Sequence, residues 1–167
     1  MEEKITVRMT DTYLFDFTLY HTYSKLAGFL TNILGAAIAF MGIIMLVMGK
    51  IKPVQIIFYL VAAVVFIAYT PLLLKYRSKK QVKGIERYHV PNEMTFNDEG
   101  IQVEFADKKE IYEWEQIQKV VTTPKTIGFY YETEKALIVP KPDFGDKFVP
   151  ILTLATKELG PARVHLR

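Results

Sequence analysis

Apolar residues gather in two long segments in the first half of the chain. Residues 26–49 contain no charged side chain, and neither do residues 53–74. A helix rises ~1.5 Å per residue and needs about 20 apolar residues to cross a ~30 Å hydrocarbon core, a length that each segment reaches. Two buried helices of a soluble protein fit the pattern less well, because such helices are shorter and keep a polar edge. The pattern therefore predicts a hairpin of two transmembrane helices.

Glycine recurs at intervals of seven residues along the first apolar segment. This spacing keeps the glycines on one slowly drifting stripe of a helix. Small residues let helix backbones approach in lipid, so the stripe is interpreted as a packing seam. The second span is the nearest partner for this seam, and a homodimer through the same stripe is the alternative. The seam residues are Gly28, Gly35, Gly42 and Gly49.

Basic residues flank the outer ends of the predicted hairpin. A cationic run follows the second span, whereas the connection between the spans offers Lys50 and Lys52. Lys and Arg near span ends favour the cytoplasmic side, so both termini are predicted to lie in the cytoplasm. Anionic lipid headgroups are a second interpretation of the run, at ~1 kcal/mol per cation. The run consists of Lys75, Arg77, Lys79, Lys80 and Lys83.

The segment before the first span alternates and then becomes aromatic. Residues 4–9 have the alternation of a strand, and residues 11–24 are expected to form an aromatic helix. Tyr13, Phe17 and Tyr20 share one face of this helix, which suits either the headgroup layer or packing against a soluble domain. Because a small β domain has edges to cover, residues 4–9 are predicted to add as a strand to the C-terminal sheet.

The last part of the chain changes to short alternating strands. Residues 143–159 then adopt helical spacing, which Gly160 is expected to end. The predicted fold is thus a membrane α-hairpin plus an α+β domain, in which a small antiparallel β-barrel is capped by a C-terminal helix. The expected strands are residues 93–97, 101–105, 110–114, 117–122, 126–131 and 136–139.

These patterns divide the chain of 167 residues into four predicted segments. Residues 1–25 hold the N-terminal strand and the aromatic helix, and residues 26–74 form the hairpin. A basic helical linker at residues 75–91 leads to a cytoplasmic domain at residues 92–167. The first apolar segment is too long for a signal-peptide core and is expected to remain in the mature protein.

Residues that carry catalysis or bind metals are sparse. The chain has no cysteine, and His21, His89 and His165 are too dispersed for metal-ligand spacing. No Gly-rich phosphate loop or nucleophile turn is present, and the uncharged spans do not favour an ion pathway. A net charge of +3, concentrated beside the predicted membrane, does not favour nucleic acid. We expect no enzyme, no cofactor and no metal.

Four short motifs lie in the C-terminal part of the chain: FNDEGI at residues 96–101, YEWEQIQKVVTT at 112–123, GFYYE at 128–132 and ALIVPK at 136–141. These motifs resemble the YcxB-like family of bacterial membrane proteins. With the paired spans, the resemblance covers nearly the whole chain. The Trp-x-x-Ile spacing and the Pro-Lys that closes the last strand are its distinctive features.

The resemblance implies a bacterial inner-membrane protein whose C-terminal domain is similar to pleckstrin-homology folds. Trp114 and Ile117 are expected in the core of this domain, and Lys141 is its candidate binding residue. Pro142 departs from the pattern, because a basic residue is expected after Lys141. Analogy to that fold suggests headgroup or peptide binding, but the acidic turn at residues 97–100 speaks against phosphoinositide recognition.

Three functions fit this sequence. The first is a membrane-anchored cytoplasmic binding or scaffolding module, an accessory or regulatory protein that acts through protein contacts. The second is an immunity membrane protein that blocks a toxin inserting into the bilayer. The third is an anionic-lipid sensor that uses the basic run and the β domain. The uncharged spans and the acidic turn favour the first function over the third.

Overall fold

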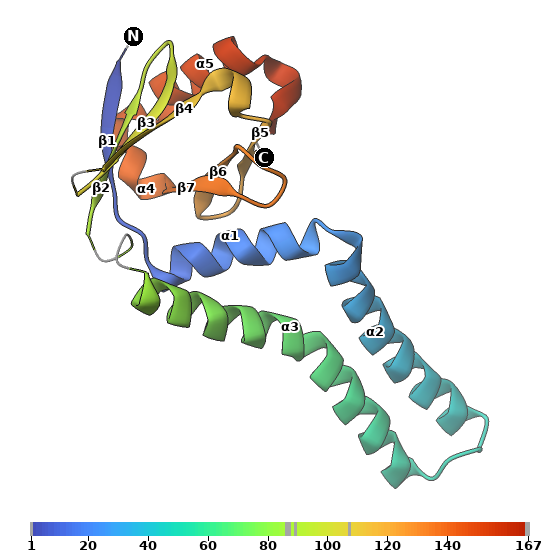
Figure 1. Ribbon diagram of the computed structural model, residues 1–167. Coiled ribbons are helices and arrows are strands. Elements are labelled where there is room, and N and C mark those ends of the chain that lie inside the picture. The colour runs from blue at the N-terminus through green and yellow to red at the C-terminus, as the bar shows by residue number, and fades with distance from the viewer. Residues whose placement is uncertain (1, 86–87, 89, 107, 166–167) are drawn as a thin grey trace. The chain divides into compact units, whose positions relative to one another are not determined.

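The protein is described by a computed structural model that covers residues 2–85, 88, 90–106 and 108–165 (Figure 1). The chain divides into two compact units. The helical unit is Thr18–Arg77, and the α/β unit combines Met1–Phe17 with Ser78–Arg167. The predicted linker at residues 75–91 includes positions 86, 87 and 89, which lie outside the described residues, as does His89 itself.

The helical unit is built around α2 (Leu26–Val47) and α3 (Ile56–Gly84), joined by a turn and the short η1 (Pro53–Gln55). Figure 1 shows α2 and α3 as a hairpin. Both are long and apolar enough to cross a membrane by length and composition, which confirms the two predicted long apolar helices. The first predicted span ends two residues early, because Gly49 adopts a φ of +67° and turns the chain. The second helix, α3, ends at Gly84, a residue type that often ends helices.

One four-stranded sheet of the α/β unit runs in the order β1-β2-β3-β4, with every neighbouring pair antiparallel. Its first strand comes from the N-terminus: Ile5 lies opposite Met94 and Val7 opposite Asn92. Ile5 and Val7 are buried, so the pairing covers an apolar face as well as an edge. The predicted strand addition is confirmed. The strands are β1 (Glu3–Val7), β2 (Asn92–Phe96), β3 (Gly100–Phe105) and β4 (Lys108–Glu113).

The second sheet has the order β7-β6-β5-β8. Its central pairs are antiparallel, whereas the two-residue β8 lies parallel to β5 and was not expected from its length. The strands form two sheets that are not closed into a barrel, because no strand of the first sheet pairs with one of the second among the described strands. The short η3 (Trp114–Gln116) connects β4 to β5. The strands are β5 (Lys119–Thr122), β6 (Thr126–Tyr130), β7 (Ala136–Pro140) and β8 (Val164–His165).

A C-terminal helix follows the sheets, as predicted, but it is shorter than expected. The chain forms α4 (Lys141–Phe144) and η4 (Gly145–Lys147) before α5 (Phe148–Leu159). Gly145 interrupts the expected single helix, because its φ of +54° lies outside the right-handed helical region. Gly160 ends α5 with a φ of +77° and leads into η5 (Pro161–Arg163).

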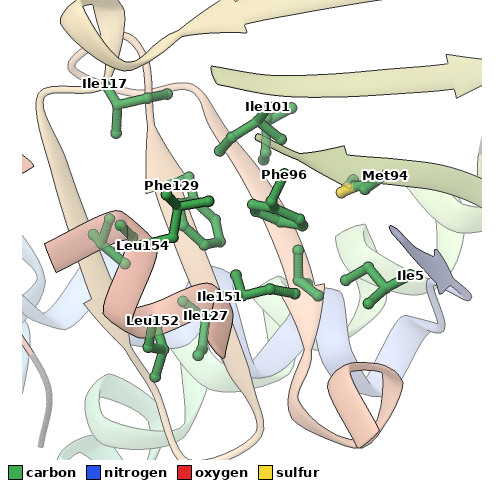
Figure 2. Packing of buried hydrophobic residues seen from close by; sticks show 14 of the residues in the cluster. Ile5, Met94, Phe96, Ile101, Ile117, Ile127, Phe129, Ile151, Leu152 and Leu154 are labelled. Carbon is green, nitrogen blue, oxygen red and sulfur yellow. The ribbon is translucent and has the colours of Figure 1, made fainter. Parts of the chain in front are cut away.

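The hydrophobic core lies between the two sheets and α5, as Figure 2 shows. Phe96 of the first sheet and Phe129 of the second place their ring centroids 5.5 Å apart. Ile151 of α5 is fully buried in the same cluster. Most strands contribute buried side chains to this core, but β4 contributes the half-buried Tyr112, and every residue of β6 is buried.

Trp114 is in the core although it is not in a strand. The alternating pattern placed it at the end of a strand, but the chain turns there into η3. Its indole is 5% exposed, and its Nε1 donates a hydrogen bond of 2.9 Å to the carbonyl oxygen of Asn97. A buried indole needs such an acceptor, and the backbone turn supplies the orientation. Ile117, three residues later, is fully buried in the same core.

Candidate functional site

Asp16 joins the first helix, α1 (Asp11–Tyr23), to the turn between β5 and β6. Its Oδ2 accepts hydrogen bonds from the hydroxyl of Thr123 and from the backbone nitrogen of Lys125, the latter at 3.1 Å. The hydroxyl of Thr126 donates a longer hydrogen bond, of 3.4 Å, to the same oxygen. The hydroxyl oxygens of Thr123 and Thr126 are 2.7 Å apart. A carboxylate that accepts several such bonds forms a stronger contact than a neutral pair. The start of α1 is therefore held on the second sheet.

Phe17 extends this contact into the apolar part of the interface. Its ring is 5% exposed and lies 5.5 Å from the ring of Tyr130, at an interplanar angle of 36°. The same ring lies over Gly128, where a Cβ atom would overlap it. Leu14 is also buried, so the first half of the aromatic helix packs against the domain. Sequence reasoning missed the role of Gly128, although glycine inside a strand is a known signal of close approach.

The glycine seam makes contact with α3 at two positions. A Cβ at Gly35 would lie 2.7 Å from Cγ1 of Ile67 and 3.1 Å from the carbonyl oxygen of Ala63. A Cβ at Gly42 would lie 2.6 Å from the Cβ of Tyr59. Both glycines are buried although most of α2 is exposed. The backbone of α2 approaches α3 here because neither glycine has a side chain.

The other two glycines of the predicted seam face different surroundings. Gly28 lies against the backbone carbonyl of Thr22, near the end of α1. Gly49 lies beyond the end of α2, and a Cβ there would meet nothing within 4 Å. The contact between α2 and α3 therefore involves Gly35 and Gly42 but not the ends of the stripe.

The basic run lies on one continuous helix. Lys75 and Arg77 are in the part of α3 that belongs to the helical unit, and Lys79, Lys80 and Lys83 are in the part that belongs to the α/β unit. All five side chains are exposed. Exposed cations at the end of an apolar helix are suited to an anionic surface.

Lys141 lies at a cavity that the sequence did not predict. Its backbone nitrogen donates a hydrogen bond of 2.9 Å to the carbonyl oxygen of Lys125. Both residues line an open cavity of about 480 Å³ whose other walls include Tyr13 of α1 and Pro142. The lysine implicated by the family resemblance is thus near a second lysine and the start of α1.

The carboxyl group of Asp143, two residues after Lys141, has a shifted pKa. Burial raises the pKa of Asp143, although a hydrogen bond that its Oδ2 accepts from the backbone nitrogen of Arg8 at 2.7 Å acts in the opposite direction. Desolvation disfavours the charged form, which explains the direction of the shift. The bond also ties the end of the N-terminal strand segment to α4.

A second and more acidic cavity, of about 540 Å³, lies at the end of β4. Ile111 and Glu113 line it from β4, and Glu115 lines it from η3. The Nζ of Lys157 lies 3.8 Å from the carboxylate of Asp98 and 2.8 Å from that of Glu158, and both carboxylates line the cavity. The residues that line the cavity carry five carboxylates and one guanidinium: Asp98, Glu99, Glu113, Glu115, Glu158 and Arg163.

These surfaces present charged and polar groups suited to binding. No group of three or more His, Cys, Asp or Glu side chains able to hold a metal occurs among the described residues. The acidic cavity presents acceptors, an exposed aliphatic side chain at Ile111 and a strand edge. The cavity at Lys141 presents donors.

The comparison with known proteins bears on this part of the chain. Residues 96–149 match the family model described as YcxB-like protein. The resemblance read from the short motifs is confirmed over this YcxB-like segment, which contains Trp114, Ile117 and Lys141. No curated protein and no solved structure matches the chain.

Proposed function

We propose that this protein is a membrane-anchored binding module that acts through protein contacts. One observation carries the proposal: the segments on either side of the two apolar helices build a single folded unit. Residues 3–7 pair with β2, and Asp16 binds the turn between β5 and β6. If α2 and α3 cross the bilayer, two crossings return the chain to its starting side, as this unit requires.

The orientation proposed for the hairpin follows from its flanking charge. The exposed cations of α3, from Lys75 to Lys83, come after the second apolar helix, and such residues favour the cytoplasmic side. The α/β unit would then lie in the cytoplasm, at the inner membrane of a bacterium. An anchored domain held by both its N-terminal segment and α3 is suited to an accessory or regulatory role.

A likeness to pleckstrin-homology domains supports binding without naming the ligand. Two antiparallel-rich sheets with a C-terminal helix over their shared core are compatible with that likeness. Protein contacts are favoured over lipid headgroups because the turn between β2 and β3 is acidic at Asp98 and Glu99. The absence of an enzymatic role remains part of the proposal.

Photo-crosslinking in native membranes tests the function. A photoreactive residue at exposed positions of the α/β unit, such as Gln116 or Thr133, should give discrete adducts with other proteins. The control position is Val61 on α3, which is exposed to the surroundings of the helical unit. Adducts confined to the α/β positions would support the proposal, and a full set of α/β positions that yields no protein adduct would overturn it.

A further inference from the structure

The starting observation is that β4 ends its sheet. Among the described strands, β3 is the one neighbour of β4. The side chains of β4 are exposed apart from the half-buried Tyr112. A strand at a sheet edge presents main-chain groups that can pair with another strand. Lys108 and Lys109 protect one end of β4, because charge discourages unwanted pairing. Ile111, near the other end, is 54% exposed.

The protected and unprotected ends of β4 differ in their surroundings. Ile111 and Glu113 line the acidic cavity, which we call the acidic cleft and define by Ile111, Arg163 and the five carboxylates of Asp98, Glu99, Glu113, Glu115 and Glu158. Arg163 offsets part of this charge, and Lys157 lies 2.8 Å from Glu158 and 3.8 Å from Asp98. The other three carboxylates are those of Glu99, Glu113 and Glu115. The whole chain carries a formal charge of +3, so the charge of this surface opposes that of the protein. An exposed aliphatic side chain beside an edge strand and a concave acidic wall is suited to a polypeptide ligand.

We propose that the acidic cleft binds an extended basic segment of a partner protein, which adds as a strand to the edge of β4. Alternate side chains of an extended segment point to opposite faces. On the cleft side, a lysine or arginine would lie near Glu113 and Glu115, and an apolar side chain two residues along, on the same face of the added strand, would contact Ile111. This inference rests on the proposed function, whose partner it describes by charge and conformation.

The charge of the cleft decides against other occupants. Anionic lipid headgroups and nucleic acids carry phosphates, which the carboxylates of Glu99, Glu113 and Glu115 would repel. A positively charged helix would satisfy the charge but could not extend the sheet at β4, because a helix uses its own main-chain groups. An extended basic segment satisfies both.

The test uses the full chain in a neutral detergent and synthetic peptides. A labelled seven-residue peptide, Lys-Thr-Val-Thr-Lys-Thr-Val, which places its lysines and valines on one face of an extended strand, is titrated against the protein by fluorescence anisotropy. We expect saturable binding, and no binding of the matched peptide in which glutamate replaces each lysine. A third peptide, with proline at its central position, should bind at least several-fold more weakly, because proline lacks the main-chain donor needed for pairing.

Charge-removing variants locate the site. Glu99→Gln, Glu113→Gln and Glu115→Gln in one chain remove three exposed carboxylates of the cleft and should weaken binding about tenfold, since each exposed ion pair contributes a factor of roughly 1.4 to 5. The control removes three exposed carboxylates elsewhere: Glu132→Gln, Glu134→Gln and Asp146→Asn. It should bind like the wild type. Unchanged thermal unfolding of both variants shows that folding is intact.

Hydrogen exchange separates strand addition from simple charge attraction. The lysine–valine peptide should slow exchange in residues 108–113 and leave β7 unaffected. Equal affinity of the proline peptide, or unchanged exchange in residues 108–113, would overturn strand addition. Equal affinity of the two triple variants would overturn the site. If membrane crosslinking captures a partner equally with the cleft variant, this inference fails while the proposed function stands. If the peptide binds the acidic cleft but crosslinking captures no partner protein in membranes, the proposed function fails instead.

Discussion

The ring of Phe17 occupies the space that a side chain at Gly128 would need. These two residues come from α1 and β6, and their contact sets how closely the first helix approaches the second sheet. A glycine in the interior of a strand is normally unfavourable for the sheet. Here it permits the apolar contact that, with Asp16, holds α1 on the α/β unit.

Gly128→Ala should therefore destabilise the α/β unit by about 1–3 kcal/mol, because the added methyl group must displace the ring of Phe17. Chemical unfolding in detergent measures this loss. The control is Gly84→Ala at the end of α3, where a Cβ would meet nothing within 4 Å. In a Phe17→Ala background the cost of Gly128→Ala should fall, and additive costs would contradict the contact.

Asp16→Ala should lower the free energy of unfolding by about 1–3 kcal/mol, because the buried hydroxyls of Thr123 and Thr126 lose an acceptor. Asp16→Asn keeps one acceptor oxygen and should cost less. The matched control is Asp146→Ala, which removes an exposed carboxylate. Equal stability of the alanine and control variants in thermal unfolding would show that the contact does not support the fold.

Gly35→Leu with Gly42→Leu should force α2 away from α3, because both positions lie in close contact with α3. We expect a lower melting temperature in detergent and a lower folded yield. Ala37→Leu makes a similar change on an exposed part of α2 and should leave both quantities unchanged. A double variant that keeps its melting temperature but loses a dimer would favour the homodimer interpretation of the seam.

The proposed topology is open to cysteine labelling, since the natural chain has no cysteine. With both termini in the cytoplasm, Ile51→Cys between the apolar helices should react with a membrane-impermeant maleimide in intact cells. Thr133→Cys in the turn between β6 and β7 should react after the cells are opened. The reverse pattern would place the α/β unit outside the cytoplasm.

Asp143 gives the unfolding free energy a pH dependence. Burial raises the pKa of its carboxyl above the ordinary 3.8, so the folded state favours the protonated form. Its contribution to stability is complete below that ordinary pKa and is lost as the pH rises through the folded-state pKa. Asp143→Asn should therefore be more stable than the wild type near neutral pH, since an amide oxygen can still accept the bond from Arg8.

Denaturant titrations at about pH 3.5 and about pH 7 measure the free energy of unfolding of Asp143→Asn and of the wild type. The difference in stability between the two proteins should be smaller at the lower pH. Asp146→Asn is the control, because that carboxylate is exposed. A wild type that gains stability over the variant as the pH rises would mean that the bond from Arg8 outweighs the desolvation of Asp143.

The sequence by itself determined the elements whose cause is local. The two apolar helices follow from composition and length, and the end of α3 at Gly84 follows from a helix-ending residue. Strand β1 and its addition to the sheet follow from alternation at Ile5 and Val7 together with the need to cover an edge. Trp114 was placed in the core correctly but in the wrong kind of element, since alternation continues briefly into η3.

The tertiary structure decided what depends on contacts between distant residues. Asp16 and Thr123 are 107 positions apart, and no periodicity marks them as partners. The acidic cleft likewise draws Asp98, Glu113 and Glu158 from separate segments whose charges look solvated one by one. Local patterns report which face of an element is buried. Which elements then meet, and which edge stays open, is settled by packing of the whole core, so both candidate cavities became visible only in the folded chain.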